Sequence, residues 1–242
     1  MTQYRSRVLA TRMAGPARGL LAFGALALVM AACAGRSPRP APLTDAAHPS
    51  FSATAPDSFD VEMVTTKGTM LVRVRRHWSP LGVDRFHNLV RNRYFDSVAF
   101  HRTIRNFVAQ FGIHGDTAVS RAWRGKSIPD EPVKVVNQRG TLSYARGGPN
   151  TRGVQLFFNT VDNTPRLDTL NRFGFPPIGQ VILGLDVLDS LNWEYSGTRG
   201  GQTFPGPSQD SLSRQGNAYL QRSFPRLDYI LRARIVSSWR VR

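Results

Sequence analysis

The chain has 242 residues, enough for one large domain or two small ones, and its 41% hydrophobic and 10% aromatic content suits a packed globular core. The formal charge is +16 at pH 7, but the basic residues are scattered and form no run of five or more. We therefore expect no nucleic-acid partner, because such a site needs cations gathered on one face. The single cysteine, Cys33, excludes a disulfide within the chain.

Residues 1–32 have the pattern of an export signal. Four arginines and no acidic residue precede position 20, and an apolar run then extends from Leu20 to Cys33. A basic start, a short apolar run and small residues before a boundary are typical of a secretory signal peptide. The run is too short to predict a membrane-spanning helix, which needs about 20 apolar residues.

The end of this run, Ala31-Ala32-Cys33, resembles a bacterial lipobox, with Met30 where that pattern usually has Leu. The resemblance implies cleavage before Cys33, a lipid on its thiol, and an exported lipoprotein anchored in a membrane of the cell envelope or periplasm. The alternative is a plain signal peptide, cut near Ala32 or Ala34, that releases a soluble periplasmic or secreted protein. Residues 33–57 are rich in Pro, Ala and Ser and are expected to form a tether.

Residues 58–240 are expected to form one domain. Alternating apolar residues predict a hairpin around Lys67-Gly68, and Ser79-Pro80 predicts the start of a helix that ends near Asn92. Further patterns predict a short helix over 185–191, a Gly/Pro/Ser-rich loop over 196–208 and a helix weakened by Gly216. The other predicted strands are Ser97–His101, Phe107–Phe111, Thr141–Ala145, Gln155–Thr160, Gly179–Val187 and 229–235. Many short strands without a βαβ rhythm favour a mainly β fold, either a closed antiparallel barrel or a sandwich.

Motifs for several kinds of chemistry are absent from the sequence. Gly125-Lys126-Ser127 resembles the end of a phosphate-binding loop, but the required first glycine is Ser120. The sequence has no G-x-S-x-G elbow, and its five histidines lack a paired metal-ligand spacing. We therefore expect no cofactor and no metal, and a mechanism based on binding and electrostatics.

Two segments carry the most distinctive pattern. The first contains Phe100-His101-Arg102 and Phe107-x-x-Gln110, and the second runs from Gly140 to Phe157. Together they resemble the cyclophilin-type peptidyl-prolyl cis-trans isomerases over about residues 58–192, and residues 228–236 resemble that family's closing strand. The resemblance implies an eight-stranded closed antiparallel barrel capped by two α-helices, here with a C-terminal loop and helix insertion before the last strand. It also implies a prolyl isomerase, expected to be a monomer, that acts on proline-containing polypeptides during folding of envelope or secreted proteins.

The same resemblance assigns roles residue by residue. It makes Arg102 the catalytic arginine with Gln110 as a second catalytic residue, and Gln110 and Gln155 the polar residues that position the substrate. The apolar walls of the proline pocket and the peptide-binding edge strand are assigned to Phe107, Val108, Phe157, Leu167, Ala145 and Arg146. His101 is expected to be structural.

The sequence departs from the family at one end of this pocket. Arg166 stands where many members carry Trp, residues 170–177 form a longer segment, and the family's pocket histidine has no clear counterpart, with Asn171 or Phe175 nearest. An alternative reading is therefore a catalytically weak module with the same barrel that binds proline peptides or acts as a chaperone.

Overall fold

The computed structural model describes residues 42–170 and 173–240. The expected signal peptide, the lipidated Cys33 and Asn171 lie outside the described residues. Within the described part, no helix is both long enough and apolar enough to cross a membrane.

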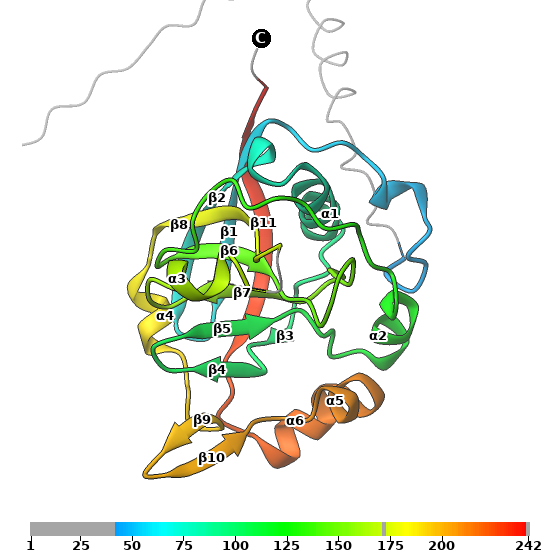
Figure 1. Ribbon diagram of the computed structural model, residues 1–242. Helices are drawn as coiled ribbons and strands as arrows, with labels where there is room; N and C mark the ends of the chain where they lie inside the picture. Colours follow the sequence, from blue (N-terminus) through cyan, green and yellow to red (C-terminus); the bar gives the residue numbers. More distant parts are fainter. Residues whose placement is uncertain (1–41, 171–172, 241–242) are drawn as a thin grey trace, which may run out of the picture. The chain divides into compact units, whose positions relative to one another are not determined.

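Strands supply most of the regular structure, which confirms the mainly β prediction (Figure 1). The strands are β1 Ser58–Thr65, β2 Gly68–Arg75, β3 Val98–Ala99, β4 Arg102–Ile104, β5 Val108–Phe111, β6 Thr141–Tyr144, β7 Leu156–Asn159, β8 Pro177–Leu183, β9 Ser196–Arg199, β10 Gln202–Pro205 and β11 Tyr229–Trp239. The helices are α1 Pro80–Arg91, α2 Thr117–Trp123, α3 Thr164–Leu167, α4 Asp186–Ser190, α5 Gln209–Gln215 and α6 Asn217–Ser223, with 3-10 turns at Pro49–Phe51 and Arg76–Trp78. Only α1 exceeds seven residues among these helices of the described chain.

Nine strands form one antiparallel sheet in the order β3-β11-β1-β2-β8-β6-β7-β5-β4. The expected number was eight. The difference arises at residues 97–104, where β3 pairs with β11 and β4 pairs with β5. Only Phe100 and His101 separate these two end strands in the chain, so the sheet curls to bring its ends together (Figure 1). Closure of the barrel by hydrogen bonds stays a prediction.

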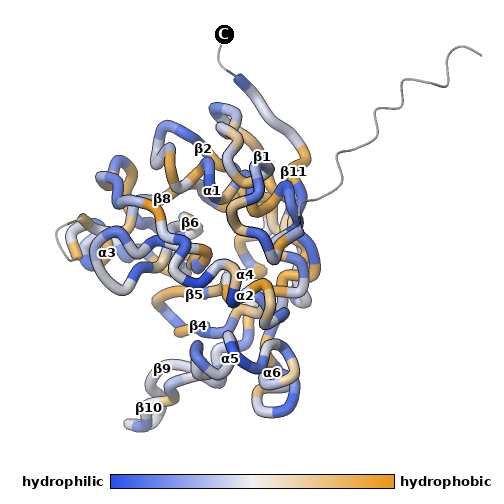
Figure 2. Tube along the Cα trace, turned by 90° about the vertical axis from the view of Figure 1, so that its right-hand side faces the viewer, coloured by the Kyte–Doolittle hydropathy of each residue, from blue (hydrophilic) through white to orange (hydrophobic). Residues whose placement is uncertain are grey.

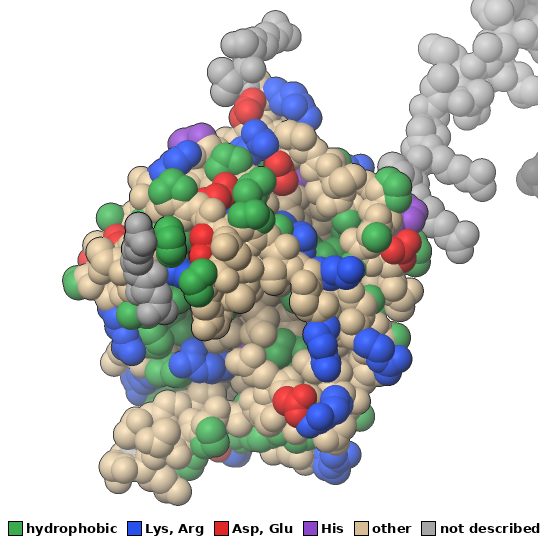
Figure 3. Space-filling view, turned by 45° about the vertical axis from the view of Figure 1, so that its right-hand side comes forward, with side chains coloured by type: hydrophobic (Ala, Val, Ile, Leu, Met, Phe, Trp, Pro, Cys, Tyr) green, Lys and Arg blue, Asp and Glu red, His purple; other side chains and the backbone are tan. Residues whose placement is uncertain are grey.

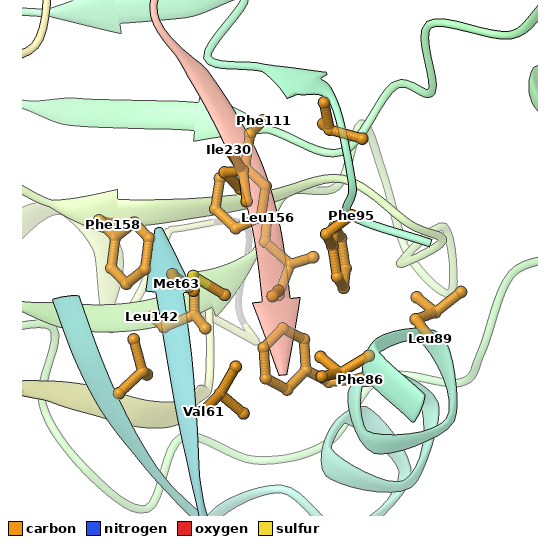
Figure 4. Packing of buried hydrophobic residues seen from close by; sticks show 14 of the residues in the cluster. Val61, Met63, Phe86, Leu89, Phe95, Phe111, Leu142, Leu156, Phe158 and Ile230 are labelled. Atoms are coloured by element: carbon orange, nitrogen blue, oxygen red, sulfur yellow. The ribbon is translucent and has the colours of Figure 1, made fainter. Parts of the chain in front are cut away.

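The core lies between the curled sheet and α1. Alternate residues of the first hairpin are fully buried, as its period-two pattern predicts: Phe59, Val61, Met63, Met70, Val72 and Val74. The helix contributes Val83, Phe86 and Leu89, and Figure 4 shows Phe86 and Leu89 projecting from α1 at the edge of the buried cluster. Burying each such side chain contributes roughly 1.5–3 kcal/mol.

Residues 43–55, expected within the tether, lie against the domain instead. Nε1 of Trp123 donates a hydrogen bond to the carbonyl of Leu43 (2.9 Å), and Nδ2 of Asn88 donates to the carbonyl of Ala53 (2.7 Å). The ring of Phe51 packs edge-on against Trp123, with 4.8 Å between centroids. The described domain therefore begins before residue 58, because scattered apolar residues anchor a segment whose composition is typical of a tether.

Residues 196–226, called the insertion below, contain more regular structure than expected. The predicted loop contains the β9–β10 hairpin, whose turn residues Gly200 and Gly201 both have positive φ, as a tight hairpin turn requires. The predicted helix divides at Gly216, where φ is +65° and an added Cβ would clash with the carbonyl oxygen of Gly115. In both Figure 1 and Figure 2, α5 and α6 lie beyond β4, and Figure 2 shows a more hydrophilic β9–β10 than the main sheet.

One carboxylate joins the chain on both sides of the insertion. Asp228, which follows it, accepts a hydrogen bond at Oδ2 from the backbone nitrogen of Asn192, which precedes it (2.6 Å). Its Oδ1 accepts from the hydroxyl of Thr66, between β1 and β2 (2.7 Å). The insertion therefore leaves and re-enters the domain at nearly the same place.

Candidate functional site

Three neighbouring strands, β4, β5 and β7, align the site residues on the outer face of the sheet. Arg102 pairs with Gln110 across one strand boundary, and Gln110 pairs with Phe157 across the next. Directly paired residues point to the same face of a sheet. Ala109 and Phe158 form the adjacent pair and are fully buried in the core. Arg102, Gln110 and Phe157 therefore share the face turned away from the core.

A groove of about 510 Å³ opens on this face. It is lined by all nine groove residues that the sequence pointed to: Arg102, Phe107, Val108, Gln110, Ala145, Arg146, Gln155, Phe157 and Leu167. The two sequence segments therefore meet in one site. Their individual roles stay predictions.

One part of the groove is an apolar pocket. Val108, Phe157, Leu167 and Phe175 form a buried cluster, with Phe107 packed against it. The rings of Phe157 and Phe175 meet edge to face, 5.7 Å between centroids. Phe175, one of the two residues that sequence analysis placed nearest the family's pocket histidine, is thus part of the pocket wall. This wall offers a water-poor surface that suits a small apolar ring.

Buried amides behind the pocket hold its walls in place. Nδ2 of Asn163 donates to the backbone carbonyl of Phe107 (2.8 Å), and Nδ2 of Asn137 donates to the carbonyl of Phe175 (2.9 Å). Nδ2 of Asn137 also donates to Oδ1 of Asp168 (2.7 Å), next to Leu167. Buried hydrogen bonds of this kind fix side-chain and backbone geometry. The sequence showed no sign of this set, because its members are far apart in the chain.

A chain of hydrogen bonds orients Arg102. Its Nη1 donates to Oε1 of Gln110 (3.1 Å), Nε2 of Gln110 donates to Oε1 of Gln155 (2.8 Å), and Nε2 of Gln155 donates to Oε1 of Gln209 (3.1 Å). Every bond runs in the same direction, so each amide is fixed by its neighbour. Gln209 belongs to α5 of the insertion, and the local sequence pattern did not indicate that it would reach the groove.

Two guanidinium groups lie near each other in the groove. The pKa of Arg102 is lowered because the side chain is partly buried and because the positive charge of Arg166 lies nearby. Arginine remains protonated at working pH in spite of such a shift. The guanidinium carbon of Arg166 lies 4.3 Å from the centroid of the Phe107 ring. Arg166 stands where many family members have Trp, and its planar guanidinium covers the ring of Phe107.

The side chain of Arg146 is bound within the fold rather than free in the groove. Its Nη2 donates to the carbonyl of Gly174 (2.9 Å), its Nη1 contacts Oδ2 of Asp130 (3.3 Å), and its guanidinium lies over Phe175 at 5.3 Å. Only 1% of the side chain is exposed. Arg146 therefore holds the long segment that carries Phe175, and only its backbone is free for the expected role beside Ala145.

His101 is fully buried. Burial, together with the positive charge of Arg102, lowers the pKa of its imidazole to about 4. The ring is thus neutral at physiological pH and enclosed in the fold, which agrees with the expected structural role. Without His101, the groove offers fixed hydrogen-bond donors and an apolar pocket. This arrangement is suited to binding a strained conformation of a ligand rather than to breaking a covalent bond.

A second, more polar part of the groove was not predicted as part of the site. It is formed by the segment after α2 and by α5 and includes Arg124, Lys126, Ser127, Gln209 and Ser213. In the sequence, Gly125-Lys126-Ser127 resembles only an incomplete phosphate-binding loop. Helix α2 itself was not predicted, although Asp116 caps its start by accepting hydrogen bonds from the backbone nitrogens of Ala118 and Val119.

Comparison with solved structures supports the same fold. A cyclophilin type peptidyl-prolyl cis-trans isomerase from Cryptosporidium parvum superposes with a TM-score of 0.52 at 19% identity, over 75% of this chain and 99% of that chain. The same protein crystallised in the presence of the dipeptide Ala-Pro gives a TM-score of 0.51, also at 19% identity, over 74% and 99% of the two chains.

Sequence comparison extends the likeness. A peptidyl-prolyl cis-trans isomerase from Acinetobacter baylyi is 30% identical over 132 residues, 54% of this chain and 70% of the relative. Peptidyl-prolyl cis-trans isomerase-like 3 from Homo sapiens is 34% identical, over 54% and 80%. CYP71 from Arabidopsis thaliana is 36% identical, but the chain spans only 22% of that protein. The family model described as cyclophilin type peptidyl-prolyl cis-trans isomerase/CLD matches residues 60–206. The chain therefore belongs to the cyclophilin-type peptidyl-prolyl cis-trans isomerases.

Proposed function

We propose that this protein accelerates rotation about X–Pro bonds in polypeptides, with Arg102 as the catalytic residue. The observation that carries the proposal is the guanidinium of Arg102, held by Gln110 at 3.1 Å beside a buried apolar pocket. The crystal structure of a family member with the dipeptide Ala-Pro supports proline peptides as the substrate class.

The physical chemistry of the X–Pro bond explains the role of a fixed cation. Rotation is opposed by about 18–20 kcal/mol, because the nitrogen lone pair is delocalised into the carbonyl. In the twisted transition state this lone pair returns to the prolyl nitrogen, which becomes a better hydrogen-bond acceptor. A donor aimed at that nitrogen therefore stabilises the transition state more than the ground state and lowers the barrier.

Each part of the groove has a task in this proposal. The pocket of Phe107, Phe157 and Leu167 holds the proline ring, so that the acyl side rotates. Gln110 keeps the guanidinium of Arg102 in position, and the arginine has further N–H donors for the nitrogen and a substrate carbonyl. The backbone beside Ala145 supplies the edge along which the peptide lies.

The test is the isomerisation rate of a short X–Pro peptide, measured by NMR exchange spectroscopy, which needs no coupling protease. We expect Arg102→Ala to lower kcat/KM about 100- to 1,000-fold, the usual effect of removing one transition-state donor. Arg102→Lys should recover part of the loss, because it restores the charge without the planar fork. Arg105→Ala is the matched control, because Arg105 is exposed and stacks on Trp193 outside the groove lining.

An unchanged rate in Arg102→Ala would refute the role of this residue. If the wild-type protein binds the peptide but does not accelerate its rotation, the alternative of a proline-peptide-binding or chaperone module with the same fold is correct.

We further propose that the protein is exported and anchored in the cell envelope through a lipid on Cys33, and that it assists the folding of envelope or secreted proteins. The support is the lipobox-like sequence Ala31-Ala32-Cys33 after a basic, apolar leader. Metabolic labelling with a radioactive fatty acid should mark the wild-type chain and not Cys33→Ala. Absence of label from the wild type, or label that persists in Cys33→Ala, would overturn the anchor.

A further inference from the structure

The groove lining is strongly one-sided in charge. Among the described residues that line it are five basic ones and no Asp or Glu: Arg102, Arg124, Lys126, Arg146 and Arg166. The chain as a whole has twice as many basic as acidic residues, 32 against 16. The described lining has no carboxylate at all, so its side chains carry a net positive charge.

Four of these cations have no carboxylate partner in the described chain, and three of the four are exposed. Arg146 is paired with Asp130, and Arg102 is held by Gln110. Arg124, Lys126 and Arg166 are exposed, and no ion pair joins them to an acidic residue in the described part of the chain. By contrast, Asp210, beside Gln209 on α5, already pairs with Arg214.

The unpaired cations lie on two sides of the groove. Arg166 belongs to α3, whereas Arg124 and Lys126 follow α2, and Figure 1 shows α2 and α3 on opposite sides of β5 and β7. In Figure 3 basic side chains border the hollowed face in several places, and acidic ones are fewer. A peptide that crosses the site would therefore pass positive charge on both sides of its proline.

The guanidinium of Arg166 is also restrained by an aromatic contact. Its guanidinium lies over the Phe107 ring at 4.3 Å, so the ring covers one face of the cation and limits its motion. A cation restrained in this way loses less conformational freedom when a carboxylate binds. Beside an apolar wall the attraction between opposite charges is also stronger than in bulk water.

We propose that the groove selects X–Pro segments with acidic residues on both sides of the proline, through Arg166 on one side and Arg124 with Lys126 on the other. This inference rests on the proposed function and names its substrate class. Complementary charge also accelerates encounter and disfavours basic segments through repulsion.

The test uses five peptides of equal length with Gln-Pro-Gln, Glu-Pro-Gln, Gln-Pro-Glu, Glu-Pro-Glu or Lys-Pro-Lys at the centre. NMR exchange spectroscopy gives kcat/KM, and shift titrations on the same samples give dissociation constants. At low salt we expect the doubly acidic peptide to exceed the neutral one by about tenfold in kcat/KM and in affinity. Added salt should reduce this ratio, and the lysine peptide should be the poorest.

Variants locate the preference. Arg166→Gln should bring the acidic-to-neutral ratio of one singly acidic peptide close to one, and Arg124→Gln/Lys126→Gln should do so for the other. Arg91→Gln, which changes an exposed arginine outside the groove lining, should leave both ratios unchanged.

Three results would overturn the inference. The first is a wild-type ratio at or below one. The second is an unchanged ratio in the variant that combines Arg166→Gln, Arg124→Gln and Lys126→Gln. The third is displacement of the acidic peptide at physiological salt by a single-stranded oligonucleotide of equal charge. Turnover of the neutral peptide without acidic preference removes this inference and leaves the proposed function intact. If no peptide is turned over, the proposed catalysis fails, and the dissociation constants still decide the preference.

Discussion

The cations buried in the fold and the exposed cations at the groove differ in their partners. Arg146 and Arg152 have 1% of their side chains exposed, and each is paired with carboxylates. Arg124, Lys126 and Arg166 are exposed at the groove and unpaired within the described chain. Burial of a charge is costly unless a partner compensates it. The two buried arginines are therefore neutralised within the fold, and the three exposed cations supply the unpaired charge on which the proposed preference for acidic peptides rests.

The strongest test of this contrast is the partner of Arg152. Nη2 of Arg152 donates to Oε2 of Glu131 (2.9 Å), and Glu131 also accepts hydrogen bonds from the backbone nitrogens of Leu81 (2.8 Å) and Gly82 at the start of α1. Burial alone would raise the pKa of Glu131, but these hydrogen bonds, with one from Ser79, lower it.

We expect Glu131→Gln to lower the free energy of unfolding by about 3–5 kcal/mol, because it leaves the Arg152 cation buried and poorly compensated. Chemical denaturation measures the loss. Asp210→Asn is the matched control, since its ion pair with Arg214 is exposed on α5 and should contribute 1 kcal/mol at most. Equal effects of the two variants would contradict the contrast.

His101 extends the comparison to a buried group without a carboxylate. Its pKa of about 4 lies below the usual 6.5, because burial disfavours the charged form. As pH falls below 6.5, the unfolded chain binds a proton that the folded chain does not, so stability is lost between pH 6.5 and 4. At pH 5 the loss from this one group is roughly 2 kcal/mol.

Denaturation at pH 7.5 and pH 5 of the wild type and His101→Phe measures this contribution. The difference between the two pH values should be smaller in the variant, whatever the substitution does at pH 7.5. His77→Gln, which changes an exposed histidine, should keep the wild-type difference. An unchanged difference in His101→Phe would show that His101 is not neutral in the fold.

The smallest expected effect concerns an uncharged residue at the groove. Gln209→Ala removes the last member of the hydrogen-bond chain that starts at Arg102. Loss of one such bond is worth about 1 kcal/mol, so kcat/KM should fall about fivefold while stability changes little. Gln215→Ala on the same helix is the control. If kcat/KM is unchanged in Gln209→Ala but clearly lower in Gln110→Ala, the hydrogen bonds that matter for catalysis extend only as far as Gln155.

Local sequence patterns predicted the elements whose buried residues recur at a regular spacing. The first hairpin and α1 were correct, because alternation and helical spacing report directly which residues are buried. The family resemblance carried by the two long segments also indicated the groove residues that meet in the structure, including Leu167, which lies outside both segments.

Features created by contacts between distant segments were missed. Leu43 and Phe51 anchor a segment that reads as a tether, and Gln209 reaches the site only because α5 packs against α2. Neither contact leaves a periodic signal in its own segment. The hairpin at Gly200 and Gly201 could have been found, because a glycine pair is a strong turn signal.

The meeting of both ends of the insertion at Asp228 makes this part of the molecule a separable module. Because Asn192 and Asp228 are hydrogen bonded at 2.6 Å, a chain that leaves and returns there imposes little strain on the sheet, and lengthening such a loop costs little free energy. A chain of this family can therefore gain or lose this wall of the groove, which includes Gln209, without rebuilding the curled sheet that carries Arg102.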